Sequence, residues 1–233
     1  LLLLLVVLFY KILLNNERTP KSAVGNVSLD NISGLYGKHW TKSEVLKSWV
    51  SWPMLIAIMA QSMFGTIFFF QQVTLGIEKG WEINQFAMLV PVYTVVSIIS
   101  TFIAGSLIDK FGVRRLVPFY LIPGMLGFVI GSFLKDPIAS SLTFALLGMT
   151  TGLSNSFSGT FWPEFFGTKH LGDVRAIATS SMVIASALGP LFSGFFLDLN
   201  ISLSVQFQLM ALIMSICTIG LGIISLKTKS DMR

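Results

Sequence analysis

The sequence contains few charged residues. Only 12% of its 233 residues are Asp, Glu, Lys or Arg, about half of the roughly 25% found in an average soluble domain. Hydrophobic residues make up 53%, and the mean hydropathy is +0.77. The sequence therefore predicts an integral membrane protein. The net charge of +5 does not indicate nucleic-acid binding, because the basic residues lie in short separate connections rather than on one face.

Cysteine and histidine are also scarce. Cys217 is the single cysteine and lies in an apolar run, so an intrachain disulfide is excluded and a packing role is favoured. The two histidines, His39 and His170, fall in predicted connections. We expect no metal and no cofactor. An enzyme is not expected either, because Glu164, His170 and Asp173 are dispersed rather than clustered.

Long apolar runs, by contrast, are abundant. A helix needs about 20 apolar residues to cross a bilayer, and the runs lack the alternation of a membrane β-barrel. An all-α polytopic membrane protein is predicted, with its six-helix bundle over residues 49–226. The expected spans are Val50–Leu75, Phe86–Leu107, Leu116–Phe133, Ser140–Ser158, Ala176–Leu197 and Leu203–Leu226.

Three segments lie outside the predicted bundle. Residues 1–14 are apolar but too short to cross alone, and they lack the flanks of a signal peptide. They are interpreted as the end of a truncated transmembrane helix, which makes the chain a C-terminal fragment. Residues 15–48 form a polar connection, in which Thr41-Lys-Ser-Glu44 has the spacing of a helix-starting capping box. Residues 227–233 form a tail.

The connections divide by charge. The segment 15–48 with Lys11, the turn 109–115, the connection 159–175 and the tail hold 14 of the 16 Lys and Arg residues. The alternating connections hold only Lys79 and Lys135. Since Lys and Arg are retained on the cytoplasmic side, the first group and the C-terminus are predicted to be cytoplasmic. The glycosylation patterns at Asn26 and Asn31 are discounted for that reason.

A charged turn between the second and third spans carries a recognisable pattern. It reads Gly105-Ser-Leu-Ile-Asp-Lys-Phe-Gly-Val-Arg-Arg115, which resembles the loop signature of the major facilitator superfamily. In that family the loop joins the second and third helices of each six-helix half. The resemblance implies that this chain is the second half of a twelve-helix fold, with 15–48 as the cytoplasmic connection between the halves.

The resemblance implies a role for the turn. Its signature residues are Gly105, Asp109, Gly112, Arg114 and Arg115. Asp109 would sit against the positive end of a neighbouring helix dipole, and the arginines would pair with acidic groups or phospholipid. Such contacts would latch the cytoplasmic side closed, with the partner helix in the first half. The alternative is that these residues only fix topology and make a tight turn.

Two further stretches are similar to segments of the family. Ala187-Leu-Gly-Pro-Leu-Phe-Ser-Gly194 resembles a Gly-Pro motif of antiporter members, and Gly189 with Pro190 predicts a helix kink with or without a coupling role. The run Trp162–Gly172, followed by Arg175, resembles the cytoplasmic connection of bacterial monocarboxylate- or oxalate/formate-porter-like members.

Polar residues inside the spans are the candidates for substrate binding, because burying them without a partner costs free energy. Gln61, Phe68 and Gln72 would share one helical face, and Thr179, Ser186 and Ser193 repeat every seven residues. Hydrogen bonds within or between helices are the alternative for each polar side chain. The candidates are Gln61, Phe68, Gln72, Tyr93, Asn155, Thr179 and Ser186.

No span carries Asp, Glu, Lys, Arg or His near its centre. Any titratable group for proton coupling, or countercharge for an anion, must then lie in the first half. With the resemblance, the sequence predicts a secondary active transporter of a small solute, working by alternating access in a bacterial plasma membrane. A coupling ion or counter-substrate, the bilayer and the missing N-terminal half would be its partners. The alternative is a transport-inactive sensor or interaction protein of the same fold.

Overall fold

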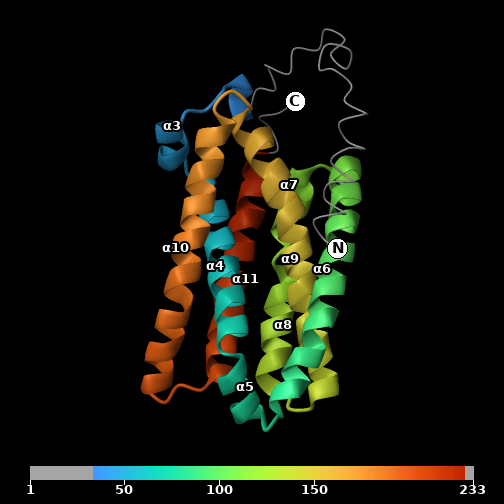
Figure 1. The fold of residues 1–233 in the computed structure, drawn as a ribbon. Coiled ribbons are helices and arrows are strands. Elements are labelled where there is room, and N and C mark those ends of the chain that lie inside the picture. Colours follow the sequence, from blue (N-terminus) through green and yellow to red (C-terminus); the bar gives the residue numbers. More distant parts are fainter. Residues whose placement is uncertain (1–33, 229–233) are drawn as a thin grey trace, which may run out of the picture. The chain divides into compact units, whose positions relative to one another are not determined.

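The structure is a computed structural model that describes residues 34–228, apart from the side chains of residues 83 and 84. The expectations for residues 1–14, for 15–33 with Asn26 and Asn31, and for 229–233 concern residues outside that range. Figure 1 shows the helices side by side. They are η2 (Leu35–Gly37), α3 (Lys42–Lys47), α4 (Ser51–Phe70), α5 (Gln72–Lys79), α6 (Ile83–Phe111), α7 (Val113–Leu116), η3 (Val117–Phe119), α8 (Ile122–Phe133), α9 (Pro137–Phe166), α10 (Leu171–Asp198) and α11 (Leu203–Lys227).

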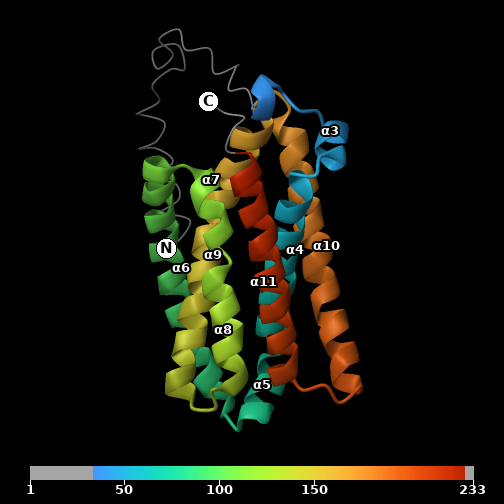
Figure 2. The same ribbon diagram turned by 180° about the vertical axis from the view of Figure 1, so that it is seen from behind.

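Five stretches of the described chain are long and apolar enough to cross a membrane. They are Ser51–Phe70, Gln85–Phe111, Val113–Phe133, Leu171–Asp198 and Leu203–Lys227. The remaining expected span, Ser140–Ser158, lies inside α9. That helix is 30 residues long, but its many Ser, Thr and Gly residues lower its mean hydropathy, so it is not among these five stretches. It runs alongside α6 in both ribbon views (Figures 1 and 2).

The first expected span is not one helix. It divides at Gln71, whose ψ of 20° is far from the helical value near −42°, and α5 continues to Lys79. The predicted end of the first span at Leu75 was therefore wrong, since the residues that follow it are helical as far as Lys79. No proline marks this break, so the sequence pattern gave no warning of it.

Two other boundaries differ from the expectation. The span Leu116–Phe133 is assembled from α7, η3 and α8, with Pro118 and Pro123 in the first turns of the last two, because proline lacks the amide hydrogen of a continuous helix. The expected connection 159–175 is mostly helical, since α9 extends to Phe166 and α10 begins at Leu171. Pro163 lies inside α9 rather than ending it.

Glycines set the contact between neighbouring helices. A Cβ atom on Gly148 would lie 2.3 Å from the Tyr93 carbonyl oxygen, and one on Gly152 would lie 2.2 Å from the Ser97 carbonyl oxygen. Only glycine permits so close an approach of α9 to α6. Gly148 and Gly152, four residues apart on α9, therefore form a close-packing face toward α6.

Aromatic rings fill the middle of the bundle. Phe68 of α4 is 1% exposed. Its ring centroid lies within 6.5 Å of the ring centroids of four phenylalanines from four other helices, namely Phe86, Phe128, Phe144 and Phe207. Cys217 is buried as well, which agrees with the packing role expected for it. The core therefore ties α4, α6, α8, α9 and α11 together through side chains that are distant in sequence.

The start of α3 has the expected capping box. The Thr41 amide and hydroxyl both donate to Oε2 of Glu44, at 2.8 and 2.9 Å, and Lys38 forms an ion pair with the same carboxylate. Lys38 and then the Thr41 groups lower the pKa of Glu44 to about 2. This short helix directly precedes α4.

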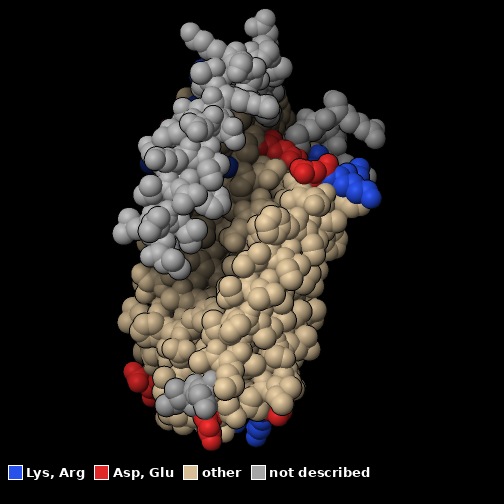
Figure 3. All heavy atoms as spheres, turned by 45° about the vertical axis from the view of Figure 1, so that its right-hand side comes forward, with Lys and Arg blue, Asp and Glu red and all other residues tan. Residues whose placement is uncertain are grey.

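The connections alternate between two ends of the bundle, as the charge pattern predicted. Figure 1 shows α3, α7 and the α9–α10 connection at one end, and α5 with the connections after α8 and α10 at the other. Of the described Lys and Arg residues, all but Lys79 and Lys135 lie at the first end. The surface in Figure 3 shows a broad band between the ends that lacks Lys, Arg, Asp and Glu.

Candidate functional site

The turn after α6 owes its shape to Gly112. This residue ends α6 with φ of 80° and ψ of 146°, a backbone conformation that side chains with a Cβ rarely adopt. The next helix, α7, begins at Val113, so the chain reverses within one residue. The turn that the sequence pattern predicted is thus confirmed. Glycine is required at position 112 because of the backbone conformation there.

The charged residues of the turn point to different surroundings. Asp109 is exposed and forms no ion pair with another described residue. Arg114 instead donates from Nε and Nη2 to the Ser225 carbonyl oxygen near the end of α11, at 3.3 and 3.4 Å, and acts electrostatically on Glu164 of α9. Arg114 therefore ties the turn to its own bundle, whereas Asp109 is available to a partner outside it.

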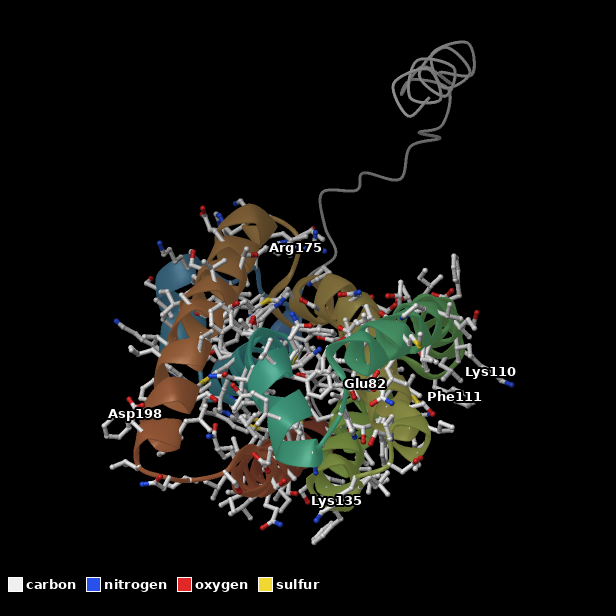
Figure 4. The ribbon with its side chains drawn as sticks, turned by 60° about the horizontal axis from the view of Figure 1, so that its bottom comes forward. Glu82, Lys110, Phe111, Lys135, Arg175 and Asp198 are labelled. Carbon is white, nitrogen blue, oxygen red and sulfur yellow. The ribbon has the colours of Figure 1, made fainter. Side chains whose placement is uncertain are left out.

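The other signature residues lie at the surface of this end. Arg115 is exposed, and Lys110 extends over the Phe111 ring and outward from α6 (Figure 4). Gly105 lies within α6, and a Cβ atom there would meet nothing within 4 Å. Nothing in the described bundle requires glycine at position 105.

Gln61 and Tyr93 meet beside a small interior cavity. The Tyr93 hydroxyl hydrogen-bonds with Thr151 Oγ1 of α9 at 2.9 Å, and Tyr93 packs on Phe69. Gln61, Tyr93 and Thr151 line a cavity of about 20 Å³. Gln61 Oε1 is buried there without a hydrogen-bond partner among the described residues. This cavity is the place where candidate polar side chains from α4, α6 and α9 come together.

Gln61, Phe68 and Gln72 do not act as one face. Phe68 is buried in the aromatic core, and the break at Gln71 puts Gln72 on α5, where it is exposed beside a second cavity lined also by Trp81 and Glu82. Gln61 and Phe68 do line one cavity, but the prediction was wrong for Gln72 because it assumed an unbroken helix. Gln72 belongs to the end of the bundle and Gln61 to its middle.

The three polar residues that repeat along α10, Thr179, Ser186 and Ser193, have different surroundings. Ser186 Oγ is 2.7 Å from Thr66 Oγ1 of α4, and Ser193 Oγ donates to Gln206 Oε1 of α11 at 2.7 Å. Thr179 is exposed. Asn155 of α9 is exposed as well. Thr179 and Asn155 thus keep their polar groups free for contact outside the described bundle.

Gly189 and Pro190 lie inside α10, which continues from Leu171 to Asp198. A Cβ atom on Gly189 would be 2.9 Å from the Met63 carbonyl oxygen. The glycine therefore brings α10 against α4, where Ser62 also donates to the Met182 carbonyl oxygen at 3.0 Å. Helix contact is the role that the structure gives to Gly189.

Sequence reasoning missed several residues that link helices. Thr66 and Thr151 are paired with Ser186 and Tyr93. Glu78 and Lys79 contact α11 and α8. Hydroxyl residues are common in apolar helices, and an acidic–basic pair at a helix end is common too, so the sequence offered no signal for these partners.

Comparison with known proteins agrees with this architecture. The family model of the Major Facilitator Superfamily matches residues 53–231. The chain is 30% identical over 135 residues to the bacillibactin exporter of Bacillus subtilis (strain 168), which covers 51% of this chain and 33% of that protein. It is 24% identical over 123 residues to the uncharacterized MFS-type transporter YfkF of the same organism, covering 53% of this chain and 32% of that protein.

The matched part spans about a third of the length of each of these relatives. The apolar helices and these likenesses make the chain an integral membrane protein. The signature turn, the helical bundle and the match over residues 53–231 together show that the chain belongs to the major facilitator superfamily.

Proposed function

We propose that the chain is the second half of a secondary active transporter that moves a small solute across the membrane by alternating access. The observation that carries this proposal is the family match together with a bundle whose signature carboxylate, Asp109, is exposed and unpaired among the described residues. Rocking of two halves about a central site is how such folds transport. The likeness to a bacillibactin exporter makes outward movement of a small organic compound the first activity to test.

Asn155 and Thr179 are our first choice for solute contact within this half. Both are exposed, whereas Tyr93, Ser186 and Ser193 have partners inside the bundle. Gln61 is the second choice, because its amide oxygen has no partner among the described residues. These groups are uncharged, so this half would contact hydroxyl, carbonyl or amide groups of the solute.

The test is solute flux in proteoliposomes that contain the full-length protein. Transport of at least one compound from a panel of small organic solutes is expected. Asn155→Ala and Thr179→Ala should raise the KM, whereas Gln208→Ala, an exposed amide on α11, should leave it unchanged. No flux for any compound at normal protein abundance would favour a transport-inactive sensor of the same fold.

We also propose that the C-terminus and the Asp109 turn face the cytoplasm of a bacterial plasma membrane. The support is the concentration of Lys and Arg at that end. Single cysteines at Lys110 and Lys135, both exposed, should react with a membrane-impermeant maleimide from opposite sides of intact cells. Reaction of both positions from outside would contradict the orientation.

A further inference from the structure

Helices α10 and α11 form the walls of an apolar groove, and α4 forms its floor. The groove has a volume of about 260 Å³, and its lining includes Phe192 and Phe196 of α10, Leu209 and Ile213 of α11, and Ile67 of α4. Both ribbon views show α4 between these two helices (Figures 1 and 2). Although α10 and α11 follow each other in the sequence, they leave a space between them along this stretch.

The two polar side chains of the groove are already engaged. Ser193 and Gln206 are 1% and 2% exposed. The Ser193 hydroxyl donates to Gln206 Oε1 at 2.7 Å, and Gln206 Nε2 donates to the Ile201 carbonyl oxygen at 3.0 Å. An occupant of the groove would therefore meet apolar surface. A polar solute would lose its hydrogen bonds to water there without replacing them, which costs free energy.

The groove has a length that fits within one leaflet of a bilayer. Along α11 it extends from Gln206 to Ile213, which is about 10 Å at 1.5 Å per residue. The hydrocarbon core of a bilayer is about 30 Å thick, so each leaflet contributes about 15 Å. Because α11 begins at Leu203, the groove lies in the leaflet at the α5 end of the bundle.

The outer face of α11 indicates what the groove opens onto. From position 209 to position 226, each exposed residue of α11 is leucine or isoleucine. These residues are Leu209, Leu212, Ile213, Ile216, Ile219, Ile223 and Leu226. Leu209, Leu212 and Ile213 belong both to this aliphatic face and to the groove. A continuous apolar face on a transmembrane helix is a surface for lipid chains. The exposed polar residues Asn155 and Thr179 lie instead on α9 and α10.

We propose that the groove binds one acyl chain of a bilayer phospholipid. A chain of methylene groups matches a site that is elongated and offers no free polar group. It would also supply the dispersion contacts that the lining residues lack on their open side. Lipid tails are as apolar as leucine, so the chain is held by its fit to the groove rather than by the hydrophobic effect. This inference requires only that the bundle spans the membrane and does not depend on transport.

A bound chain would complete the packing of α10. This helix contacts α4 through Gly189 and through the hydrogen bond between Ser186 and Thr66. Further along, at Phe192 and Phe196, its aromatic rings border the groove, and Ser193 bonds to Gln206 of α11. The chain would thus fill the space between α10 and α11 on the lipid side of that bond.

The experiment is photochemical labelling of the full-length protein in lipid nanodiscs. The discs contain a phosphatidylcholine with a diazirine near the end of one acyl chain, and peptide mass spectrometry locates the products. Phe64 and Met210 line the groove and are both buried in the bundle, so labelling of them requires a chain inside it. A phosphatidylcholine with the diazirine on its headgroup should not label these two residues.

Ile213→Trp tests whether the chain occupies the groove. Ile213 is exposed at the rim, so a larger ring there can fill the groove without disturbing the core. Labelling of Phe64 and Met210 should fall roughly tenfold, because overfilling an apolar site disfavours its occupant by about that factor. Ile219→Trp is the matched control. It adds the same ring to the aliphatic face of α11, outside the groove, and should leave the labelling unchanged.

Two results would overturn the proposal. If the chain diazirine labels neither Phe64 nor Met210, another surface covers the groove. If labelling of these residues is the same in Ile213→Trp and Ile219→Trp, the label reports bulk lipid only. Thermal unfolding midpoints check that the variants are folded, and Leu209→Trp, also at the rim, replaces Ile213→Trp if that variant is not. A loss of labelling confined to the rim variants supports the chain site, whether or not solute flux is found.

Discussion

Among single residues, Gln61 is a polar side chain in an apolar helix, and its hydrogen bonds decide whether its role is structural or functional. Its Oε1 atom is buried without a partner in the described bundle, next to the Tyr93–Thr151 pair. An unpaired buried acceptor costs free energy. Its retention in the middle of a transmembrane bundle therefore suits a group that is used during transport.

Gln61→Met tests this interpretation. Methionine has a similar volume and no polar group, so the substitution should raise the free energy of unfolding by about 1 kcal/mol, which is the lower part of the cost of an unpaired acceptor. Transport should fall at the same time. Thermal unfolding and flux at equal abundance give the two readouts, and a less stable protein would show that Gln61 is bonded after all.

Gly112 is required by its backbone conformation alone. Nothing lies within 4 Å of a Cβ atom built there, but φ is 80°. Gly112→Ala should therefore destabilise the protein by about 1–3 kcal/mol, the cost of holding a residue with a Cβ atom in a backbone conformation that is essentially restricted to glycine. Gly105→Ala is the matched control, because residue 105 is helical and equally uncrowded. Equal thermal unfolding midpoints for Gly112→Ala and Gly105→Ala would contradict a conformational requirement for glycine at position 112.

Glycine acts differently at the scale of helices. On α9, Gly148 and Gly152 let the backbone of α6 approach closely, and Gly189 of α10 does the same for α4. Helix pairs in membranes depend on such contacts, because lipid offers no hydrophobic effect to drive their association. The bundle is thus held by close packing at a few small residues and by its aromatic core.

Gly152→Ala should push α6 away from α9. The added Cβ would lie 2.2 Å from the Ser97 carbonyl oxygen and 2.7 Å from Ser100 Cβ, and overpacking of this kind costs about 1–3 kcal/mol. Gly159→Ala, in the same helix with nothing within 4 Å, should be neutral or stabilising. A thermal unfolding midpoint unaffected by Gly152→Ala would show that the two helices can separate without cost.

At one end of the whole molecule, the charged turn after α6 is bonded to the bundle through only some of its residues. Arg114 is bound to the end of α11, whereas Asp109 is exposed and forms no ion pair within the described bundle. An exposed carboxylate is what the latch requires, because its partner helix would belong to the first half of the fold. The latch itself stays a prediction.

Asp109→Asn should impair transport more than it impairs expression. The substitution keeps the size of the side chain but removes its charge, and the interaction of a charge with a helix end contributes up to about 2 kcal/mol. We expect roughly a tenfold lower rate of flux at matched membrane abundance. A rate equal to that of the wild type would leave topology as the only role of this residue.

The sequence by itself determined the features that depend on local composition. Apolar length located the membrane helices, the distribution of Lys and Arg predicted the alternation of the connections, and the pattern from Gly105 to Arg115 indicated the family. Each of these signals lies within a short stretch, since crossing a bilayer and making a turn are requirements on consecutive residues. They needed no knowledge of distant partners.

Tertiary structure decided which polar groups are engaged and where the helices break. Ser186 and Tyr93 are bonded to residues more than 50 positions away, and Glu78 caps a helix that begins at Leu203. The break at Gln71 has no proline or glycine to announce it. Such features depend on helices that meet only after folding, so the hydrogen-bond partner of a polar side chain cannot be read from its own neighbours in the sequence.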